Sequence, residues 1–157
     1  MRITFILNGK QVNKDIDPSK PLLRVLREDY SIKSVKEGCG RGECGTCTVI
    51  LDGKPVTSCM VPAGRVGGRE VLTLEGLEMT GSIRIIQKAF MESGAVQCGF
   101  CTPGMIITAY CLLESQKTPS RREIRAAISG NICRCTGYTK IIDAVYAVSR
   151  HIKENMA

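Results

Sequence analysis

Aromatic side chains are scarce in this sequence of 157 residues: tryptophan is absent, and there are only three phenylalanines and four tyrosines. The core must therefore be built mainly from Ile, Val, Leu and Ala on helices and short strands. Catalytic patterns are missing too, since we find no nucleophile–base pair and no phosphate-binding loop. The single histidine, His151, lies near the C-terminal end of a predicted helix and is interpreted as a surface residue. We therefore predict no catalytic residue on this chain.

A long apolar run is also missing. No stretch of about 18 consecutive apolar residues occurs, so we predict no membrane-spanning helix and no membrane partner. The segment Met1–Leu7 largely alternates polar and apolar residues and is too short for a signal peptide. These features predict a cytoplasmic protein, whose thiols stay reduced. Disulfides are thereby disfavoured, and nine cysteines would leave one thiol unpaired.

The net charge of +7 does not point to nucleic acid. No basic stripe is interleaved with aromatic residues, and no nucleic-acid recognition motif is present, so we predict no nucleic-acid partner. The cluster of Arg121, Arg122 and Arg125 is interpreted as a solvated helix face or as a docking face for an acidic protein.

Cysteine is the feature that the chain has in abundance, and eight of the nine form two sets of four. The first set reads C-x4-C-x2-C-x11-C, the spacing of plant-type [2Fe–2S] ferredoxins, and comprises Cys39, Cys44, Cys47 and Cys59. The second set reads C-x2-C and then C-x-C, and comprises Cys98, Cys101, Cys133 and Cys135. Because four thiolates close one two-iron core, two clusters and the transfer of single electrons are predicted.

Zinc is the alternative metal for each set, because four thiolates also make a tetrahedral zinc site. In the first set the loop argues for iron. Gly40, Gly42 and Gly45 let the backbone wrap closely and point N–H groups at the sulfurs of a negatively charged cluster. For the second set, spacing alone leaves zinc open.

The first half of the chain predicts a small sheet with a crossing helix. Residues 3–7 alternate as in a half-buried strand, Asn8-Gly9 is a type I′ hairpin signal, and residues 12–16 form the return strand. A helix with one apolar face and a second hairpin over residues 48–58 follow. We predict a β-grasp ferredoxin domain over residues 1–75.

The second half predicts helices, which makes the fold class α+β. Ser120 and Glu123 have the spacing of a capping box, and glycines mark a linker over about residues 76–82. Two successive units of helix, cysteine loop and helix would bring both cysteine loops to one end of a four-helix bundle spanning residues 83–157. The predicted helices cover residues 83–93, 102–115, 119–130 and 139–152.

Three segments resemble the iron–sulfur subunit of the molybdenum hydroxylases, the family of xanthine dehydrogenase, aldehyde oxidoreductase, carbon monoxide dehydrogenase and nicotinate dehydrogenase. They are residues 38–49 (GCGRGECGTCTV), 94–105 (GAVQCGFCTPGM) and 130–138 (GNICRCTGY). The resemblance covers nearly the whole chain and departs at no ligand position. It implies a ferredoxin domain followed by a four-helix domain, each with a [2Fe–2S] cluster.

The resemblance also implies partners. These are a large subunit with molybdopterin, usually as the cytosine dinucleotide in bacteria, and a medium subunit with FAD, in a heterotrimer or a dimer of heterotrimers. It implies that electrons leave molybdenum, pass the second cluster and then the first, and reach flavin. Gln97 matches the glutamine that hydrogen-bonds the pterin, and Cys135 matches the ligand against the pterin edge.

Three functions are therefore weighed: an electron-transfer subunit of a molybdenum hydroxylase, a free-standing two-cluster ferredoxin and a zinc-stabilised interaction domain. Gln97 favours the first, because a pterin-facing motif has no purpose in a free ferredoxin, although alone it reads as a loop amide. Cys111 lies within an apolar helix and is interpreted as a small buried hydrophobic residue. Purines, aldehydes, carbon monoxide, N-heterocycles and aryl-CoA thioesters remain alternative substrates of the whole complex.

Overall fold

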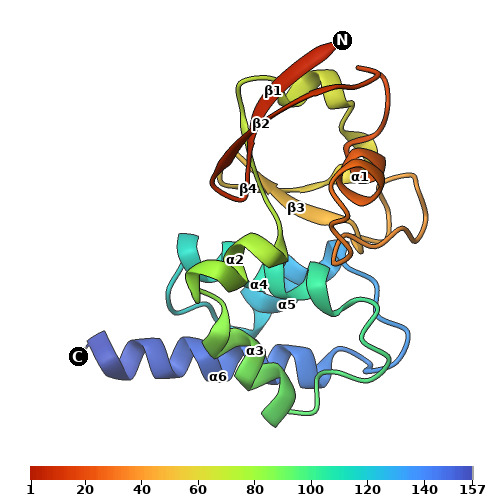
Figure 1. Ribbon diagram of the computed structural model, residues 1–157. Helices are drawn as coiled ribbons and strands as arrows, with labels where there is room; N and C mark the ends of the chain where they lie inside the picture. Colours follow the sequence, from red (N-terminus) through yellow and green to blue (C-terminus); the bar gives the residue numbers. More distant parts are fainter. Residues whose placement is uncertain (157) are drawn as a thin grey trace.

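The computed structural model describes residues 1–156 and places a half that contains the sheet beside a half made of helices (Figure 1). The predicted α+β class is confirmed. Each half has its own apolar core, and Ile50 of the sheet belongs to the core of the helical half. No helix in the described part is both long and apolar enough to cross a membrane.

A five-stranded sheet of order β2-β1-β5-β3-β4 forms the N-terminal half. Asn8 and Gly9 have φ of 51° and 77°, as a type I′ turn requires, so the predicted first hairpin is confirmed. The β5 strand pairs parallel with β1 and antiparallel with β3, and so joins the two hairpins into one sheet. The strands are β1 (Arg2–Leu7), β2 (Lys10–Asp15), β3 (Thr48–Leu51), β4 (Lys54–Thr57) and β5 (Glu70–Leu72).

One helical segment packs against this sheet. It begins as α1 (Leu22–Arg24) and continues as the π-helical turn η1 (Val25–Asp29). Its apolar side chains are buried with Phe5 of β1 in the core of this half. The predicted apolar face therefore points toward the sheet. Two short 3-10 segments, η2 (Ser58–Met60) and η3 (Ala63–Val66), follow the second hairpin.

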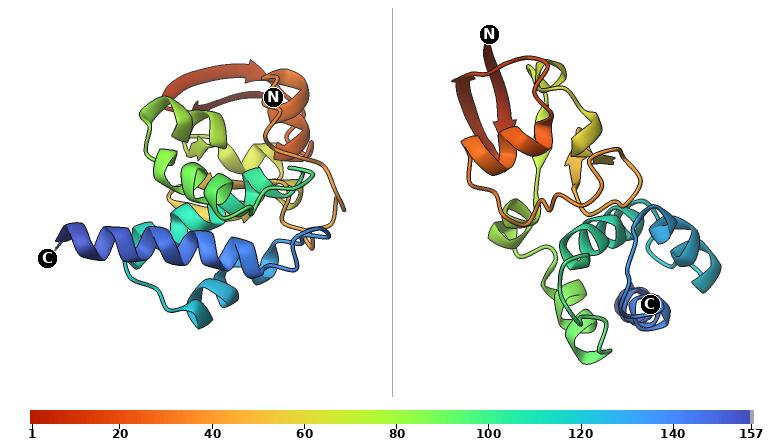
Figure 2. Two further views of the ribbon diagram at one scale, coloured as in Figure 1. Left: turned by 90° about the horizontal axis from the view of Figure 1, so that it is seen from below. Right: turned by 90° about the vertical axis from the view of Figure 1, so that its right-hand side faces the viewer.

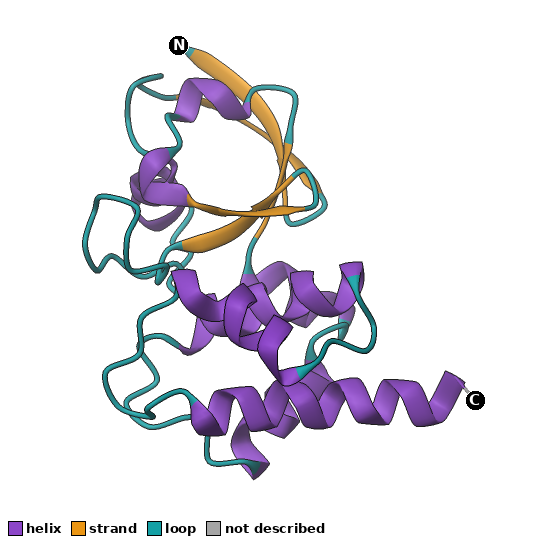
Figure 3. Ribbon diagram, turned by 180° about the vertical axis from the view of Figure 1, so that it is seen from behind, coloured by secondary structure: helices purple, strands orange, loops and turns teal. Residues whose placement is uncertain are grey.

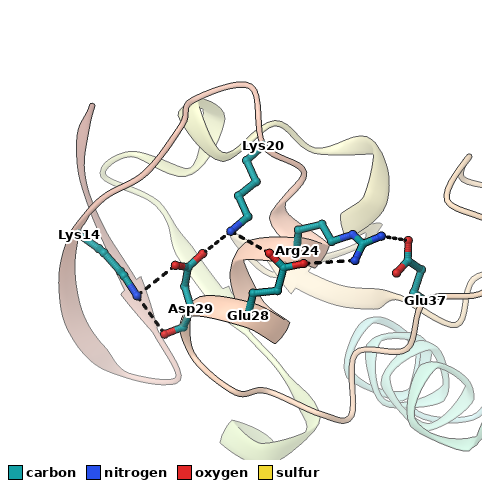
Figure 4. A network of polar contacts seen from close by, with 6 residues as sticks. All are labelled: Lys14, Lys20, Arg24, Glu28, Asp29 and Glu37. Carbon is teal, nitrogen blue, oxygen red and sulfur yellow. Dashed lines mark hydrogen bonds and ion pairs between the residues drawn. The ribbon is translucent and has the colours of Figure 1, made fainter.

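A row of alternating charges connects this helical segment to β2 and to the start of the first cysteine loop (Figure 4). Lys20 contacts the Asp29 carboxylate at 2.8 Å, and this contact, above all, lowers the pKa of Asp29. Three of the six residues are half-buried and the others are exposed, and because water screens ion pairs near the surface, the row mainly orients the segment. In order, the row comprises Lys14, Asp29, Lys20, Glu28, Arg24 and Glu37.

As far as residue 156, where the described part of the chain ends, the C-terminal half contains five α-helices around one core. The long α6 helix packs against α3 and α5 on the side of the helical half that is remote from the sheet, and its C-terminal end protrudes beyond the other helices (Figures 1 and 2). The predicted capping box is confirmed, since Ser120 and Glu123 exchange side chain to backbone hydrogen bonds at the start of α5. The helices are α2 (Leu74–Thr80), α3 (Arg84–Glu92), α4 (Thr102–Ser115), α5 (Arg121–Ala127), which the 3-10 turn η4 (Ile128–Gly130) continues, and α6 (Thr139–Met156).

The predicted linker, residues 76–82, lies largely within α2. Gly76 is not a flexible joint here: a Cβ at this position would collide with the Asn8 side chain, so glycine permits close packing against the sheet. Glu75 fastens the same helix by accepting hydrogen bonds from the backbone N–H of Ser34 at 3.0 Å and its hydroxyl at 2.6 Å. The junction between the halves is therefore packed and hydrogen-bonded.

Candidate metal centres

The first cysteine loop wraps around the sulfur of Cys39. Gly40, Gly42 and Gly45 all have positive φ, between 66° and 82°, which turns successive peptide groups toward the loop interior. The backbone N–H groups of Arg41, Glu43 and Cys44 each donate to Cys39 Sγ at 3.4 Å. These donors, that of Arg41 foremost, lower the pKa of the Cys39 thiol to about 6. The loop is therefore built to hold a negatively charged sulfur.

The four thiols of the first set come together as two pairs. Cys39 lies against Cys44, and Cys47 lies against Cys59. Cys59 reaches this position because the β3–β4 hairpin returns the chain beside the loop, and the Ser58 hydroxyl donates to the Cys47 carbonyl at 2.8 Å. Burial, together with the neighbouring Cys47 thiol, raises the pKa of Cys59 to about 11.

The second set also pairs, although its members come from two loops far apart in sequence. Cys98 Sγ lies 3.6 Å from Cys135 Sγ, and Cys101 contacts Cys133. Both loops lie on the same side of the molecule as the first cysteine loop (Figures 1 and 3). Burial and the Cys133 sulfur raise the pKa of Cys101 to about 12. Cys98 and Cys135 are exposed, whereas Cys133 is buried.

Sequence reasoning missed two residues that shape this second loop. Burial acts to raise the pKa of the Cys133 thiol, but two groups of Thr136 outweigh it and lower that pKa. The Thr136 hydroxyl lies 3.0 Å from Cys133 Sγ, and the Thr136 backbone N–H lies 3.5 Å from it. Tyr138 has φ of 69°, rare for a bulky residue, and its hydroxyl accepts the Cys133 N–H at 2.9 Å. A signal for both residues exists in the sequence, since each lies within five positions of a cysteine. The fold decides that their side chains point toward Cys133.

Paired thiols fit a two-iron core. A single ion needs its donors around one point, whereas each iron of a [2Fe–2S] core takes two thiolates. Within residues 1–156, no group of three or more His, Cys, Asp or Glu side chains is placed to hold one metal ion directly. The donors that do converge are four pairs of sulfurs, two at each site.

Gln97 lies in the second site's first loop and is exposed beside Cys98.

The N–H donors that we predicted for the loop of residues 39–47 are in place. The predicted helix start after Cys101 is present as α4, with proline in its first turn. Cys111 lies on the same helix, away from both sets of pairs, and burial foremost raises its pKa to about 11.

We expect Cys111→Ala to keep the full iron content of the chain. The residue is partly buried against the helical core, so loss of its thiol removes packing and costs about 1 kcal/mol of stability. Iron per chain and the thermal midpoint are measured together. A drop in iron at an unchanged midpoint would make Cys111 a ligand and overturn the assignment.

Two known iron–sulfur families match the two halves of the chain. The family described as "2Fe-2S iron-sulfur cluster binding domain" matches residues 5–72, and the one described as "[2Fe-2S] binding domain" matches residues 73–146. The second match covers the set for which spacing alone left zinc open, and it supports iron there.

Relatives match almost end to end. The nicotinate dehydrogenase small FeS subunit of Eubacterium barkeri is 52% identical over 149 residues, which are 94% of this chain and 95% of that protein. The xanthine dehydrogenase iron–sulfur-binding subunit of Escherichia coli O157:H7 is 44% identical over 91% of each chain. Quinoline 2-oxidoreductase from Pseudomonas putida 86 superposes with a TM-score of 0.91 at 40% identity, over 100% of this chain and 98% of that one.

Proposed function

This chain belongs to the family of iron–sulfur subunits of the molybdenum hydroxylases, and we propose that it carries single electrons between a molybdopterin subunit and an FAD subunit of one complex. As a member it is the small subunit of an oxidoreductase. The observation that supports electron transfer most directly is the arrangement of eight thiols as four pairs at two sites. We propose that the whole complex is a heterotrimer, or a dimer of heterotrimers, in the cytoplasm.

The proposed ligands follow the pairs. Each cluster, when bound, takes up and returns one electron at a time. The chain's own groups hold the sulfurs and their charge: backbone N–H groups act at Cys39, and Thr136 acts at Cys133. Since hydrogen bonds to sulfur tune a cluster's potential, these different donors predict two different potentials. We assign Cys39, Cys44, Cys47 and Cys59 to the first cluster and Cys98, Cys101, Cys133 and Cys135 to the second.

The orientation of the chain in the complex rests on the family resemblance. We propose that the second site faces the molybdenum subunit, because Gln97 matches the glutamine that hydrogen-bonds the pterin in that family, and Gln97, Cys98 and Cys135 are all exposed and accessible to a partner. The helices α3 to α6 would act as a four-helix bundle that presents these two loops. The first site then lies toward flavin. We propose that the molybdenum subunit binds its pterin in the cytosine dinucleotide form.

Purification and spectroscopy test this function against its two alternatives. The chain should copurify with a molybdenum subunit, contain about four iron atoms and show two signals by electron paramagnetic resonance (EPR) when reduced. Isolated from its partners, it should be reducible by dithionite but not by hydroxylatable substrates. Bound zinc in place of iron would establish the interaction domain, and two clusters without a molybdenum partner would establish a free ferredoxin.

Gln97→Ala should weaken the link to the molybdenum cofactor while leaving both clusters intact. The amide offers two donors and one acceptor, and its loss removes a hydrogen bond worth about 0.5–1.5 kcal/mol and leaves a pterin group unpaired. We expect lower molybdenum content of the complex or slower reduction of the second cluster by substrate.

The matched control is Gln11→Ala, an exposed glutamine on the edge strand β2. It should change neither quantity. If the Gln97 variant behaves like this control, with molybdenum content and reduction rate both unchanged, Gln97 is only a loop residue.

A further inference from the structure

The two cysteine loops meet at a buried seam, defined here as the contact of Gly45 and Thr48 with Thr108 and Asn131. Asn131 follows η4, two residues before Cys133, and only 5% of it is exposed. Gly45 lies in the first cysteine loop, 86 positions away in sequence. The seam therefore joins the halves of the molecule at the place where both candidate sites are built.

Every polar group of the Asn131 side chain is used in the seam. Its Nδ2 donates to the Gly45 carbonyl at 3.0 Å and to Thr48 Oγ1 at 3.4 Å. Its Oδ1 accepts from the Thr108 hydroxyl, on α4, at 2.9 Å. The Thr48 hydroxyl donates its own proton to the Gly45 carbonyl at 2.6 Å, so toward Asn131 its oxygen acts as a hydrogen-bond acceptor. The position thus requires a donor on one side and an acceptor on the other, which asparagine offers and aspartate does not.

The backbones in the seam are as close as glycine permits. A Cβ on Gly104 would meet the Gly45 carbonyl oxygen at 2.5 Å, and a Cβ on Gly45 would collide with the Gly130 carbonyl and approach Asn131 Nδ2 at 2.7 Å. Beside this contact, the Ile132 N–H donates to the Cys44 carbonyl at 2.9 Å. Since Ile132 precedes Cys133, one hydrogen bond and a few backbone bonds connect a proposed ligand of each cluster.

Resting on the proposed function, we propose that Asn131 is a positioning residue that holds the two cluster loops in register and thereby sets the rate of electron transfer between the clusters. Electron transfer weakens steeply as the separation of two centres grows and as the atoms between them lose contact. Asn131 holds no iron itself. It acts through Gly45 and through the adjacent bond from Ile132 to Cys44, and a looser seam would lengthen the gap without removing a ligand.

Asn131→Asp is the sharpest test, because it keeps size and the bond from Thr108 but sets an acceptor against the Gly45 carbonyl. In the complete complex we expect full iron and both cluster signals. We expect weaker magnetic coupling between the two reduced clusters, slower transfer from the second to the first, and faster hydrogen exchange of the Ile132 amide. The control is Ser129→Ala, whose hydroxyl donates within its own turn, to the Ala126 carbonyl.

A second pair of variants separates positioning from general damage. Thr108→Val removes the hydroxyl from α4, outside both cysteine loops, and should reproduce the slower transfer and weaker coupling, whereas Thr108→Ser should restore both. The positioning role would be overturned if Asn131→Asp and Thr108→Val both matched the wild type in three measurements. These are the magnetic coupling between the clusters, the rate of electron transfer and the hydrogen exchange of the Ile132 amide. A wild-type complex lacking two cluster signals would instead refute the proposed function, so the two failures are distinguishable.

Discussion

Cys59→Ser is expected to abolish one of the two cluster signals and to leave the other in place. Serine is a poor substitute for a soft thiolate ligand, and Cys59 pairs with Cys47 at the first site. About half of the four iron atoms should be lost, while the second signal keeps its shape, because the ligand sets do not interleave in sequence. Iron analysis and EPR of the reduced protein measure both effects.

The matched control is Cys111→Ser, the same chemical change at a thiol outside both sets of pairs. It should lower stability by placing a hydroxyl in a partly buried, apolar position, but keep both signals. Loss of both signals in Cys59→Ser, from a chain whose circular dichroism is still native, would argue against two independent sites and against the ligand assignment.

Gly45→Ala is expected to destabilise the chain strongly. Two effects add here. The residue has φ of 69°, which costs about 1 kcal/mol or more for alanine, and its Cβ would collide with the backbone carbonyl of Gly130. Overpacking against backbone costs a further 1–3 kcal/mol or so. A total of about 2–4 kcal/mol corresponds to a fall in the thermal midpoint of roughly 4–16 °C at this chain length.

Gly53→Ala isolates the first effect. Gly53 has φ of 78° in the second hairpin, yet a Cβ there would meet nothing within 4 Å. Its midpoint should fall by only about 2–4 °C, the cost of the backbone conformation alone. Equal shifts in the two variants would mean that the seam relaxes freely and that close contact at Gly45 is unimportant.

Much of the local structure was predictable because it depends on neighbours in sequence. Asn8-Gly9 specifies its hairpin through its own φ angles, and Ser120 with Glu123 specifies a helix start through bonds three residues apart. The cysteine spacings indicated two iron–sulfur sets, since the ligand count is a property of the thiols themselves. The end-to-end relatives support that interpretation.

The glycines show where such reasoning stops. Gly76 was interpreted as part of a linker, but it lies inside α2, where the Asn8 side chain occupies the space that a Cβ would need. A glycine required for close packing and a glycine required for flexibility are the same letter in sequence. Only the position of its neighbours distinguishes them.

By itself, the sequence determined the α+β class, the turns and caps, the eight thiols and the family to which they point. Only the tertiary structure decided which thiols pair, as Cys98 does with Cys135, and that Asn131 joins the first cysteine loop to the second. The physical reason is distance along the chain. Dihedral preferences and short-range hydrogen bonds act within a few residues, whereas a contact between positions 45 and 131 exists only once the two halves of the chain pack together.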